Sequence, residues 1–327
     1  MKPDVAITLV IPSYNRAQLI LETINSALNQ TSPFAEIIVV DDASTDGTLL
    51  ALEQFDGKIS VIASEKVGVQ TARNRGVAAA STDYVALCDS DDLLEPDFVQ
   101  VISKWLSSHP ECDSVYSNFV TFDENTTSSD KFSGAPTSFF KGATFTEGFC
   151  SDIPDLYVKT VGYQPLFSSG VTIKKSFYQA IGGYNSELNG VGSEDWEYTL
   201  RAVEAGVTSV CMKPLVRIRR HSGNDSGNKI KQLLGEVIVL EHALKFHQLA
   251  KKYSAQINSE TDNRRAQAFE LAFSASQYKH ANAILSEMSE IQRDFKFITK
   301  ILITKLVAFA QTITPFRDIR QPQNSTK

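Results

Sequence analysis

Two aspartates one residue apart, Asp89 and Asp91, carry the sharpest chemical signal in this 327-residue sequence. On an extended segment such a pair projects to the same side, so both carboxylates can meet one ligand. Carboxylate oxygens are the ligands that hard divalent cations such as Mg²⁺ or Mn²⁺ prefer, and these cations also bridge diphosphates. The alternative is that the acids, Asp92 above all, cap a helix beginning near Pro96. Three adjacent acids repel one another, which favours a bound cation at Asp89 and Asp91.

Two other polar clusters follow apolar runs, at residues 12–16 (PSYNR) and 41–48 (DDASTDGT). One carboxylate of the second cluster could accept hydrogen bonds from a nucleotide base or ribose, or the cluster could simply begin the helix expected at Thr48. The sequence has no G-x-G-x-x-G after its first apolar run and no P-loop. Phosphates would therefore be held by acids and a metal, helped by basic residues. The candidates are Arg16, Arg73, whose alternative is a surface position, and the cluster of Arg217, Arg219 and Arg220.

A glycine-rich segment at 190–192 precedes two more acids, Glu194 and Asp195. Ser193 suits the N-cap of a helix, which places both acids in its first turn, where the helix dipole stabilises them. That alone can explain the acids. The functional alternative is that the glycines let a substrate approach the backbone, and that an ionised Asp195 acts as a general base toward a hydroxyl. His221 precedes a polar loop, where it is either solvated or a ligand for metal or phosphate.

The elements that would position these clusters are predicted by two periodicities. Continuous apolar, β-branched runs predict strands buried on both faces; they lie at residues 5–11, 37–40, 59–63, 84–88 and 115–122. Helical stripes between them, such as Ile20, Ile24 and Leu28, predict strand–helix alternation and a mostly parallel sheet with helices on both faces. Carboxyl ends of parallel strands share one edge, so the clusters after the first, second and fourth runs are expected to gather there.

The rest of the chain divides into an irregular part and a helical part. Residues 123–165 show little periodicity, and their aromatic residues either line an acceptor side or simply pack. These aromatics are Phe139, Phe140, Phe145, Phe149 and Tyr157. Beyond them we expect strands at 170–173 and 207–212, helices at 175–181 and 194–205, a basic loop at 217–221, and three helical segments over 229–313.

Charge is unevenly distributed along the chain. The formal net charge is −6, but residues 1–212 hold 13 Lys/Arg against 28 Asp/Glu, and residues 213–327 hold 19 against 10. The acidic total argues against a nucleic-acid partner, and the basic C-terminal part is expected to meet something anionic. Its last helical stretch, 293–313, is apolar with scattered lysines. That stretch either lies in an anionic membrane interface or packs on the main domain or on a second subunit.

Cysteine usage and hydropathy indicate the compartment. The four cysteines lie far apart, which argues against a zinc site or a disulfide framework and favours a reducing cytosol. No stretch reaches about 18 consecutive apolar residues, so no transmembrane helix is expected. The first apolar run is too short for a spanning helix and lacks a small-residue cleavage site.

Six stretches of the sequence resemble, in the same order, the motifs of family 2 glycosyltransferases with the GT-A fold. They are VIPSYNR (10–16), VVDDASTDGT (39–48), GVQTARNRG (68–76), CDSDD (88–92), IGGYNSEL (181–188) and GSEDWEYTLRA (192–202). The resemblance implies an α/β fold: a mostly parallel sheet flanked by helices, with a Rossmann-like nucleotide-binding half and an α-helical C-terminal appendage. The implied domains are a GT-A domain at 1–227, with a nucleotide-sugar half at 1–122 and an acceptor and catalytic half at 123–227, and a helical region at 228–327.

The resemblance also implies roles for individual residues. Asp195 would be the general base of an inverting transfer, and Asp91 would bind Mn²⁺ or Mg²⁺ with Asp89 and His221 as further metal ligands. The donor would be bound by Pro12, Tyr14, Arg16, Asp42, Arg73, Asp89 and Glu194, with Asp42 facing the base and Glu194 the sugar hydroxyls. One departure lies at 65–68 (EKVG), where many relatives have an Asn- and Gly-rich turn, which weakens the expectation for donor contacts there.

The implied function is inverting, metal-dependent transfer of a sugar from a nucleotide-diphosphate donor, a UDP-sugar by preference, to a glycan or lipid-linked acceptor in cell-surface polysaccharide biosynthesis. The alternative is a catalytically silent nucleotide- or glycan-binding protein on the same fold. The expected location is cytoplasmic, with peripheral binding to the inner face of the plasma membrane. The alternative to membrane binding is that the C-terminal helices pair with a second copy of the chain to form a homo-oligomer.

Overall fold

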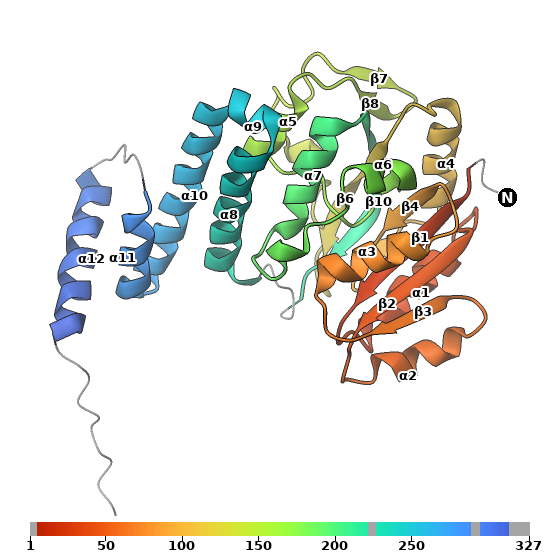
Figure 1. Cartoon of the computed structure of the whole chain (residues 1–327), viewed down its shortest axis with the longest axis horizontal. Helices are drawn as coiled ribbons and strands as arrows, with labels where there is room; N and C mark the ends of the chain where they lie inside the picture. Colours follow the sequence, from red (N-terminus) through yellow and green to blue (C-terminus); the bar gives the residue numbers. More distant parts are fainter. Residues whose placement is uncertain (1–4, 222–226, 289–294, 314–327) are drawn as a thin grey trace, which may run out of the picture.

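The computed structural model describes residues 5–221, 227–288 and 295–313, which form a long mixed sheet flanked by helices and followed by a helical region (Figure 1). The sheet has ten strands in the order β3-β2-β1-β4-β9-β6-β10-β8-β7, with β5 paired to β10. The strands are β1 (Ile7–Ser13), β2 (Glu36–Asp42), β3 (Ser60–Ser64), β4 (Tyr84–Leu87), β5 (Leu93–Leu94), β6 (Ser114–Phe122), β7 (Thr144–Thr146), β8 (Phe149–Ser151), β9 (Thr172–Lys174) and β10 (Thr208–Arg219). The fold class predicted from the sequence is confirmed.

The helices of the main domain alternate with these strands and cover both faces of the sheet (Figure 1). They are α1 (Leu19–Leu28), α2 (Thr48–Leu52), α3 (Val69–Ala79), α4 (Phe98–Ser108), α5 (Leu156–Gly162), α6 (Lys175–Ala180) and α7 (Glu194–Ala205). The helical region that follows consists of α8 (Lys229–Phe246), α9 (Gln248–Lys252), α10 (Ser254–Ser274), α11 (Tyr278–Ser286) and α12 (Phe295–Ile313). None of the helices in the described ranges combines the length and apolarity needed to cross a bilayer.

Strand β1 is buried on both faces, as its continuous apolar run predicts. Leu9 and Ile11 pack in a cluster with residues of α1 and α4, whereas Val10 packs in a second cluster with residues of α3 and α7. This division follows from the two-residue period of a strand, which sends neighbouring side chains to opposite faces. Each buried aliphatic side chain of this kind contributes about 1.5–3 kcal/mol to stability.

The direction of the strands brings several carboxyl ends to one edge of the sheet. Strands β1, β2, β3 and β4 pair in parallel. Strand β9 lies antiparallel between β4 and β6, and β10 runs parallel to β6, so β10 also points the same way as β4. The polar residues after β1, β2, β4 and β10 therefore share this edge, which we call the rim.

Three details differ from the sequence predictions. The expected basic loop at 217–221 is strand up to Arg219, because β10 stays paired to β6 as far as the Arg219–Phe122 pair. Its two arginines there, Arg217 and Arg219, also stack on the Phe122 ring. The irregular stretch 123–165 contains the hairpin β7–β8 and helix α5, which are too short to show a period.

The helical region holds five helices among its described residues, where three segments are expected, because breaks at His247 and Tyr253 divide the first segment. Residues 222–226, which include most of the polar loop after His221, and residues 293–294 of the expected last segment lie outside the described ranges. The division of the chain at 227 stays a prediction.

The aromatic residues of 123–165 mostly serve packing. Phe139, Phe149 and Tyr157 are buried, and only Phe145 of the five is strongly exposed. Helix α8 packs on α7, where Trp196 and Leu200 join its apolar side chains in one cluster. Helices α10, α11 and α12 extend from there away from the sheet (Figure 1).

Helix α8 approaches the segment before α7 so closely that one of its positions has no room for a side chain. A Cβ atom at Gly235 would lie 2.1 Å from the carbonyl oxygen of Gly192 and 2.7 Å from that of Val191. Because Glu194 and Asp195 begin α7 directly afterwards, α8 helps to fix the backbone that leads into both acids.

We predict that Gly235→Ala destabilises the protein by about 2 kcal/mol, since the methyl group must push α8 away from the 191–192 carbonyls. Urea unfolding followed by circular dichroism measures the change. Gly162→Ala is the matched control, because nothing lies within 4 Å of a Cβ at that position. Equal stability of both variants would contradict the close approach.

Candidate active site

The two loops that begin the rim are fastened to each other by short hydrogen bonds. Asn15, which has φ 51, donates its backbone N–H to Ser44 Oγ (2.8 Å), and its Oδ1 accepts from the Thr45 N–H (2.8 Å). The Arg16 N–H donates to Thr48 Oγ1 (2.9 Å). The small polar residues of both motifs thus hold the side chains of positions 14 and 16 at the rim. Sequence reasoning missed this structural role, although the density of Asn, Ser and Thr in both loops was a signal for it.

Asp91 lies where three separate segments meet. Its Oδ2 accepts from Arg16 Nε at 3.2 Å and lies 3.0 Å from His221 Nε2. Arg219 Nε donates to the backbone carbonyl of Asp91 at 3.0 Å. The structure therefore brings together three residues singled out from the sequence, which lie after β1, after β4 and after β10.

Asp89 is held by Arg73 of helix α3. Arg73 Nη2 donates to Asp89 Oδ1 at 2.7 Å and to Ser168 Oγ at 3.3 Å, and Nη1 donates to Gln70 Oε1. The Arg73 side chain is only 5% exposed and bonds Asp89, so it is not the surface charge that was the alternative; its part in donor binding stays a prediction. Burial lowers the pKa of Arg73, but the charge and hydrogen bond of Asp89, together with the charges of Tyr184 and Asp195, outweigh that effect and raise the pKa overall. Arg73 therefore stays charged.

Asp92 does not cap α4, which was the alternative considered for it. Its Oδ2 accepts from the Ser169 hydroxyl (2.5 Å) and its Oδ1 from the Arg219 N–H (2.9 Å), so it ties β10 to the segment after β4. Burial, and then the charges of Asp91 and Asp89, raise the pKa of Asp92 well above its ordinary value. Asp92 is thus a buried connecting residue beneath the rim.

Glu194 and Asp195 stand in the first turn of α7, as predicted. Ser193 occupies the N-cap position but has φ 59 and makes no side-chain cap bond; instead Glu194 Oε2 accepts from the Gly192 N–H at 3.1 Å. Burial raises the pKa of Asp195, an effect that the nearby Arg73 charge opposes and the Asp89 charge adds to. Burial and the charge of Asp195 raise the pKa of Glu194. Asp195 therefore lies within electrostatic range of the pair Arg73–Asp89.

The remaining predicted donor contacts lie after β1 and β2. Pro12 is buried inside β1, opposite Val40 of β2, and its part in donor binding stays a prediction. Tyr14 is 42% exposed at the rim. Asp42 is almost fully buried and accepts from the backbone N–H groups of Val67 and Gly68.

The predicted metal ligands are brought together in part. Asp91 Oδ2 and His221 Nε2 lie side by side. The carboxylate oxygen suits Mn²⁺ or Mg²⁺, and the imidazole nitrogen favours Mn²⁺ of the two, with water and phosphate available to complete the shell. Asp89 instead turns its carboxylate to Arg73. Two buried N–H donors nearby, Arg73 Nε and Gln70 Nε2, have no hydrogen-bond partner among the described residues, which fits a site that takes an oxygen-rich ligand.

A second cluster of potential ligands was missed from the sequence because its members come from α7 and from the end of α8. Glu197, His242 and His247 place one ligand atom each within 4.8 Å of one another. Arg201, however, already holds Glu197 with two bonds, Nε to Oε1 at 2.6 Å and Nη2 to Oε2 at 2.8 Å. The carboxylate is therefore neutralised by Arg201 and this cluster connects α7 to the helical region. Glu197 lies two residues after Asp195 in α7, and side chains two residues apart point to opposite sides of a helix, so Glu197 points away from the rim.

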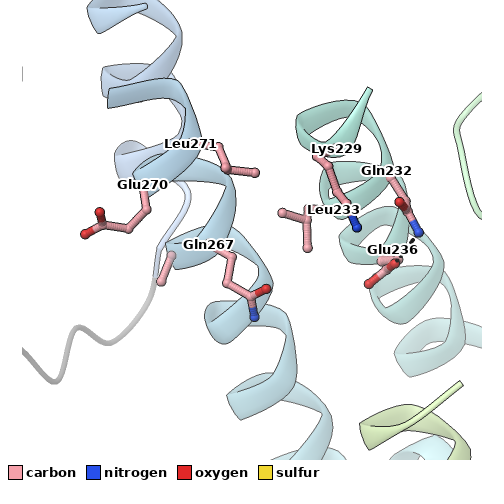
Figure 2. Close-up of a pocket in the computed structure, with 8 residues that line it drawn as sticks. Lys229, Gln232, Leu233, Glu236, Gln267, Glu270 and Leu271 are labelled. Carbon is pink, nitrogen blue, oxygen red and sulfur yellow. Dashed lines mark hydrogen bonds between the residues drawn. The ribbon is translucent and has the colours of Figure 1, made fainter. Parts of the chain in front are cut away.

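A cavity of about 520 Å³ lies between α8 and α10 (Figure 2). It is lined by Lys229, Gln232, Leu233, Glu236, Ala266, Gln267, Glu270 and Leu271. Both of its carboxylates already have cationic partners, Arg264 for Glu236 and Lys300 for Glu270. None of the lining residues is one of the rim acids, so the cavity is separate from the rim.

Two family models match adjacent parts of the chain. Residues 8–154 match the family described as glycosyl transferase family 2, and residues 155–224 match the one described as the N-terminal domain of galactosyltransferase. Together these matches cover all the rim residues described above.

Two similar proteins are named as glycosyltransferases. The putative teichuronic acid biosynthesis glycosyltransferase TuaG of Bacillus subtilis is 35% identical over 136 residues, which are 40% of this chain and 54% of TuaG. Glycosyltransferase GlyA of Streptococcus pneumoniae is 34% identical over 38% of this chain and 18% of its own length. The chain thus spans about half of TuaG and much less of GlyA. Among solved structures, S. aureus TarS 1–349 in complex with UDP has a TM-score of 0.52 and 16% identity, covering 95% of this chain and 93% of TarS 1–349, which shows a common fold.

We predict that Glu197→Gln lowers the free energy of unfolding by about 3 kcal/mol, because it leaves Arg201 without its buried charge partner. Burial raises the pKa of Glu197, but bonds from His247 and Arg201 bring it from 4.5 down to about 2. The stabilisation is therefore complete above pH 4.5 and is lost as pH falls toward 2.

Urea unfolding at several pH values tests this prediction. The difference between the wild type and Glu197→Gln should be constant near neutral pH and should shrink below pH 4.5. The control is Glu241→Gln, because the Glu241 side chain is 43% exposed and its partner Arg265 also pairs with Asp262; this substitution should cost less than about 1 kcal/mol. A difference that does not change with pH contradicts the assignment.

Proposed function

Because residues 8–154 match the family model described as glycosyl transferase family 2, we propose that the chain is an inverting, divalent-metal-dependent glycosyltransferase. It moves a sugar from a nucleotide-diphosphate donor, a UDP-sugar, to a hydroxyl of a glycan or lipid-linked acceptor. TarS 1–349 has been solved with UDP and with UDP-GlcNAc, and this supports a UDP-sugar as donor. The name of TuaG, which refers to teichuronic acid biosynthesis, supports a role in cell-surface polysaccharide biosynthesis.

The observation that carries the proposal is the gathering of acids from distant segments at one rim. Asp91 lies against His221 and Arg16, Asp89 lies against Arg73, and Asp195 lies within electrostatic range of that last pair. The nucleoside diphosphate that leaves the sugar carries negative charge, which must be neutralised when its bond to the sugar breaks. The arrangement provides both a place for a cation and basic side chains for the phosphates.

On the donor side, Asp91 and His221 are the residues that would hold the metal ion. When bound, the ion neutralises the leaving diphosphate. Arg16 lies against Asp91 and Arg73 against Asp89, which supports a role for both guanidinium groups in binding the phosphates. Tyr14 and Asp42 would bind the base.

On the acceptor side, one carboxylate suffices. Asp195 accepts the proton of the attacking hydroxyl, and a single displacement from the face opposite the leaving group inverts the anomeric centre. Its pKa, raised by burial, lies closer to the working pH than that of an exposed aspartate, which favours proton transfer. Glu194, anchored by the Gly192 N–H, would contact sugar hydroxyls from the neighbouring position.

We predict that Asp195→Asn reduces kcat about 10³-fold, because general-base catalysis contributes of that order. UDP release from a UDP-sugar is the measurement, made after a thermal-shift screen of sugar nucleotides with and without Mn²⁺ has identified the donor. The wild-type rate should fall on the acid side at a pH above the ordinary pKa of an aspartate, 3.8, since the pKa of Asp195 is raised.

Binding of UDP with Mn²⁺, measured by calorimetry, should be nearly unchanged in Asp195→Asn. Glu124→Gln, in an exposed loop, is the control and should leave both rate and binding unchanged. Full turnover by Asp195→Asn contradicts its role as the base. Metal-dependent binding without turnover in the wild type would indicate the alternative, a silent binding protein.

Helix α12 supports association with an anionic membrane surface. One side packs inward through Ile301 and Ala308, and Lys300 is paired with Glu270 there. The other side exposes six large apolar side chains: Phe295, Ile298, Leu302, Ile303, Leu306 and Phe309. The helix carries lysines but no acidic residue, as expected for an interfacial helix on anionic lipid. The four cysteines are buried and unpaired, which supports the cytoplasmic face of that membrane.

We predict that Leu302→Asp together with Leu306→Asp abolishes flotation of the full chain with phosphatidylglycerol-containing vesicles. The apolar stripe that would enter the interface is then interrupted by charge. Leu50→Asp is the matched control, since Leu50 is equally exposed but lies on α2 at the other end of the molecule. Equal flotation of all three proteins, or none by the wild type, removes the membrane proposal; concentration-dependent dimerisation lost in the double variant would assign the stripe to a second copy.

A further inference from the structure

Lys66, in the turn that departs from the family pattern, covers the part of the rim where a base would bind. Its Nζ lies 2.8 Å from the centre of the Tyr14 ring and 3.0 Å from Asp42 Oδ2. An ammonium group over an aromatic face is held by the quadrupole of the ring. A flat ligand that stacks on Tyr14 must therefore take the place of this ammonium.

Lys66 is the partner of Asp42 that can leave. The other bonds to this carboxylate come from the backbone: the Val67 N–H donates to Oδ1 (2.6 Å), and the Gly68 N–H lies 3.2 Å from Oδ1 and 3.0 Å from Oδ2. The side chain of Lys66 is 51% exposed and flexible, whereas that of Asp42 is 4% exposed. A buried carboxylate is costly without its partners, so a ligand that displaces Lys66 must bring an N–H donor of its own.

The acceptor Asp42 and the donor Lys66 thus lie side by side at the face of the Tyr14 ring. Asp42 accepts only, and the ammonium of Lys66 donates only. The backbone N–H groups of Val67 and Gly68 hold this turn on Asp42, so Lys66 stays beside the carboxylate after its side chain has moved aside. When a ring N–H of the base meets Asp42, the group beside that N–H faces Lys66 and must be an acceptor. Uracil, thymine and guanine carry a carbonyl oxygen there. Cytosine and adenine held in the same position turn a ring nitrogen without hydrogen toward Asp42 and their amino group toward Lys66.

We propose that Lys66 selects the nucleobase of the donor. In the free protein its ammonium occupies the base site. When the base binds, the N–H of the base replaces Lys66 as the partner of Asp42, and Lys66 donates a hydrogen bond to the adjacent carbonyl oxygen. This inference rests on the glycosyltransferase function proposed above. It assigns a specificity-determining role to a residue that the family motifs do not include. If Lys66 only formed a surface ion pair, its removal would change the binding of all nucleotides equally or not at all.

The test compares UDP with CDP, which differ only at this edge, by calorimetric titration of the full chain in the presence of MnCl₂. Each matched contact to a charged group is worth about tenfold in affinity. Wild type should therefore bind UDP about 100-fold tighter than CDP, and Lys66→Met should reduce that ratio to about tenfold. Lys66→Arg, which retains a donor, should keep most of the preference. Lys58→Met, a substitution of an exposed lysine before β3, should leave the ratio unchanged.

An independent readout follows the position of the ammonium itself. After reductive ¹³C-methylation, the Lys66 resonance, assigned from its loss in Lys66→Arg, should be shifted by the Tyr14 ring and should move on addition of UDP. An unchanged UDP-to-CDP ratio in a folded Lys66→Met protein overturns the inference while the glycosyltransferase function stands. Absence of Mn²⁺-dependent binding of any nucleoside diphosphate to the wild type overturns both.

Discussion

Crowded negative charge at the end of strand β4 is the constraint on which the rest of the structure depends. Asp89, Asp91 and Asp92 follow one another within four residues, and each is stable there only because a group from elsewhere meets it. Arg73 reaches Asp89 from α3, and Arg16 reaches Asp91 from the loop after β1. These contacts link the site to the order of the strands. A rearranged sheet would leave carboxylates buried and unpaired, at a cost of several kcal/mol each.

Helix α7 carries Asp195 at the rim, and its position is fixed by contacts with the helical region. Its first turn carries Asp195, while the opposite side carries Glu197, which is bound by Arg201 and lies 3.4 Å from His247. The backbone before the helix touches α8 at Gly235. The C-terminal helices therefore do more than extend the molecule, because they hold the helix that presents the proposed base. Only their outermost member, α12, leaves an apolar side uncovered among the described residues.

The sequence predicts the sheet and the rim well, because both depend on local signals. Buried strands need continuous apolar runs, and parallel strands must end at one edge, so Arg16, Asp42 and Asp91 can be expected at one edge from their neighbours alone. The place of Asp195 in the site is implied only by the family resemblance. Contacts between distant segments leave no such signal. Nothing local shows that Arg73 turns inward, that His247 reaches Glu197, or that Lys66 lies on Tyr14. The extension of β10 is missed for the same reason, since its pairing with β6 outweighs the basic character of its last residues.

The central claim, that Asp91 and His221 hold a divalent ion at the rim, is tested most directly by anomalous scattering from crystals of the full chain grown with UDP and MnCl₂. The account predicts a manganese peak bonded to the Asp91 carboxylate and His221 Nε2, with the diphosphate of UDP completing its shell. UDP bound at the rim without manganese beside Asp91, or manganese found instead among Glu197, His242 and His247, would contradict it.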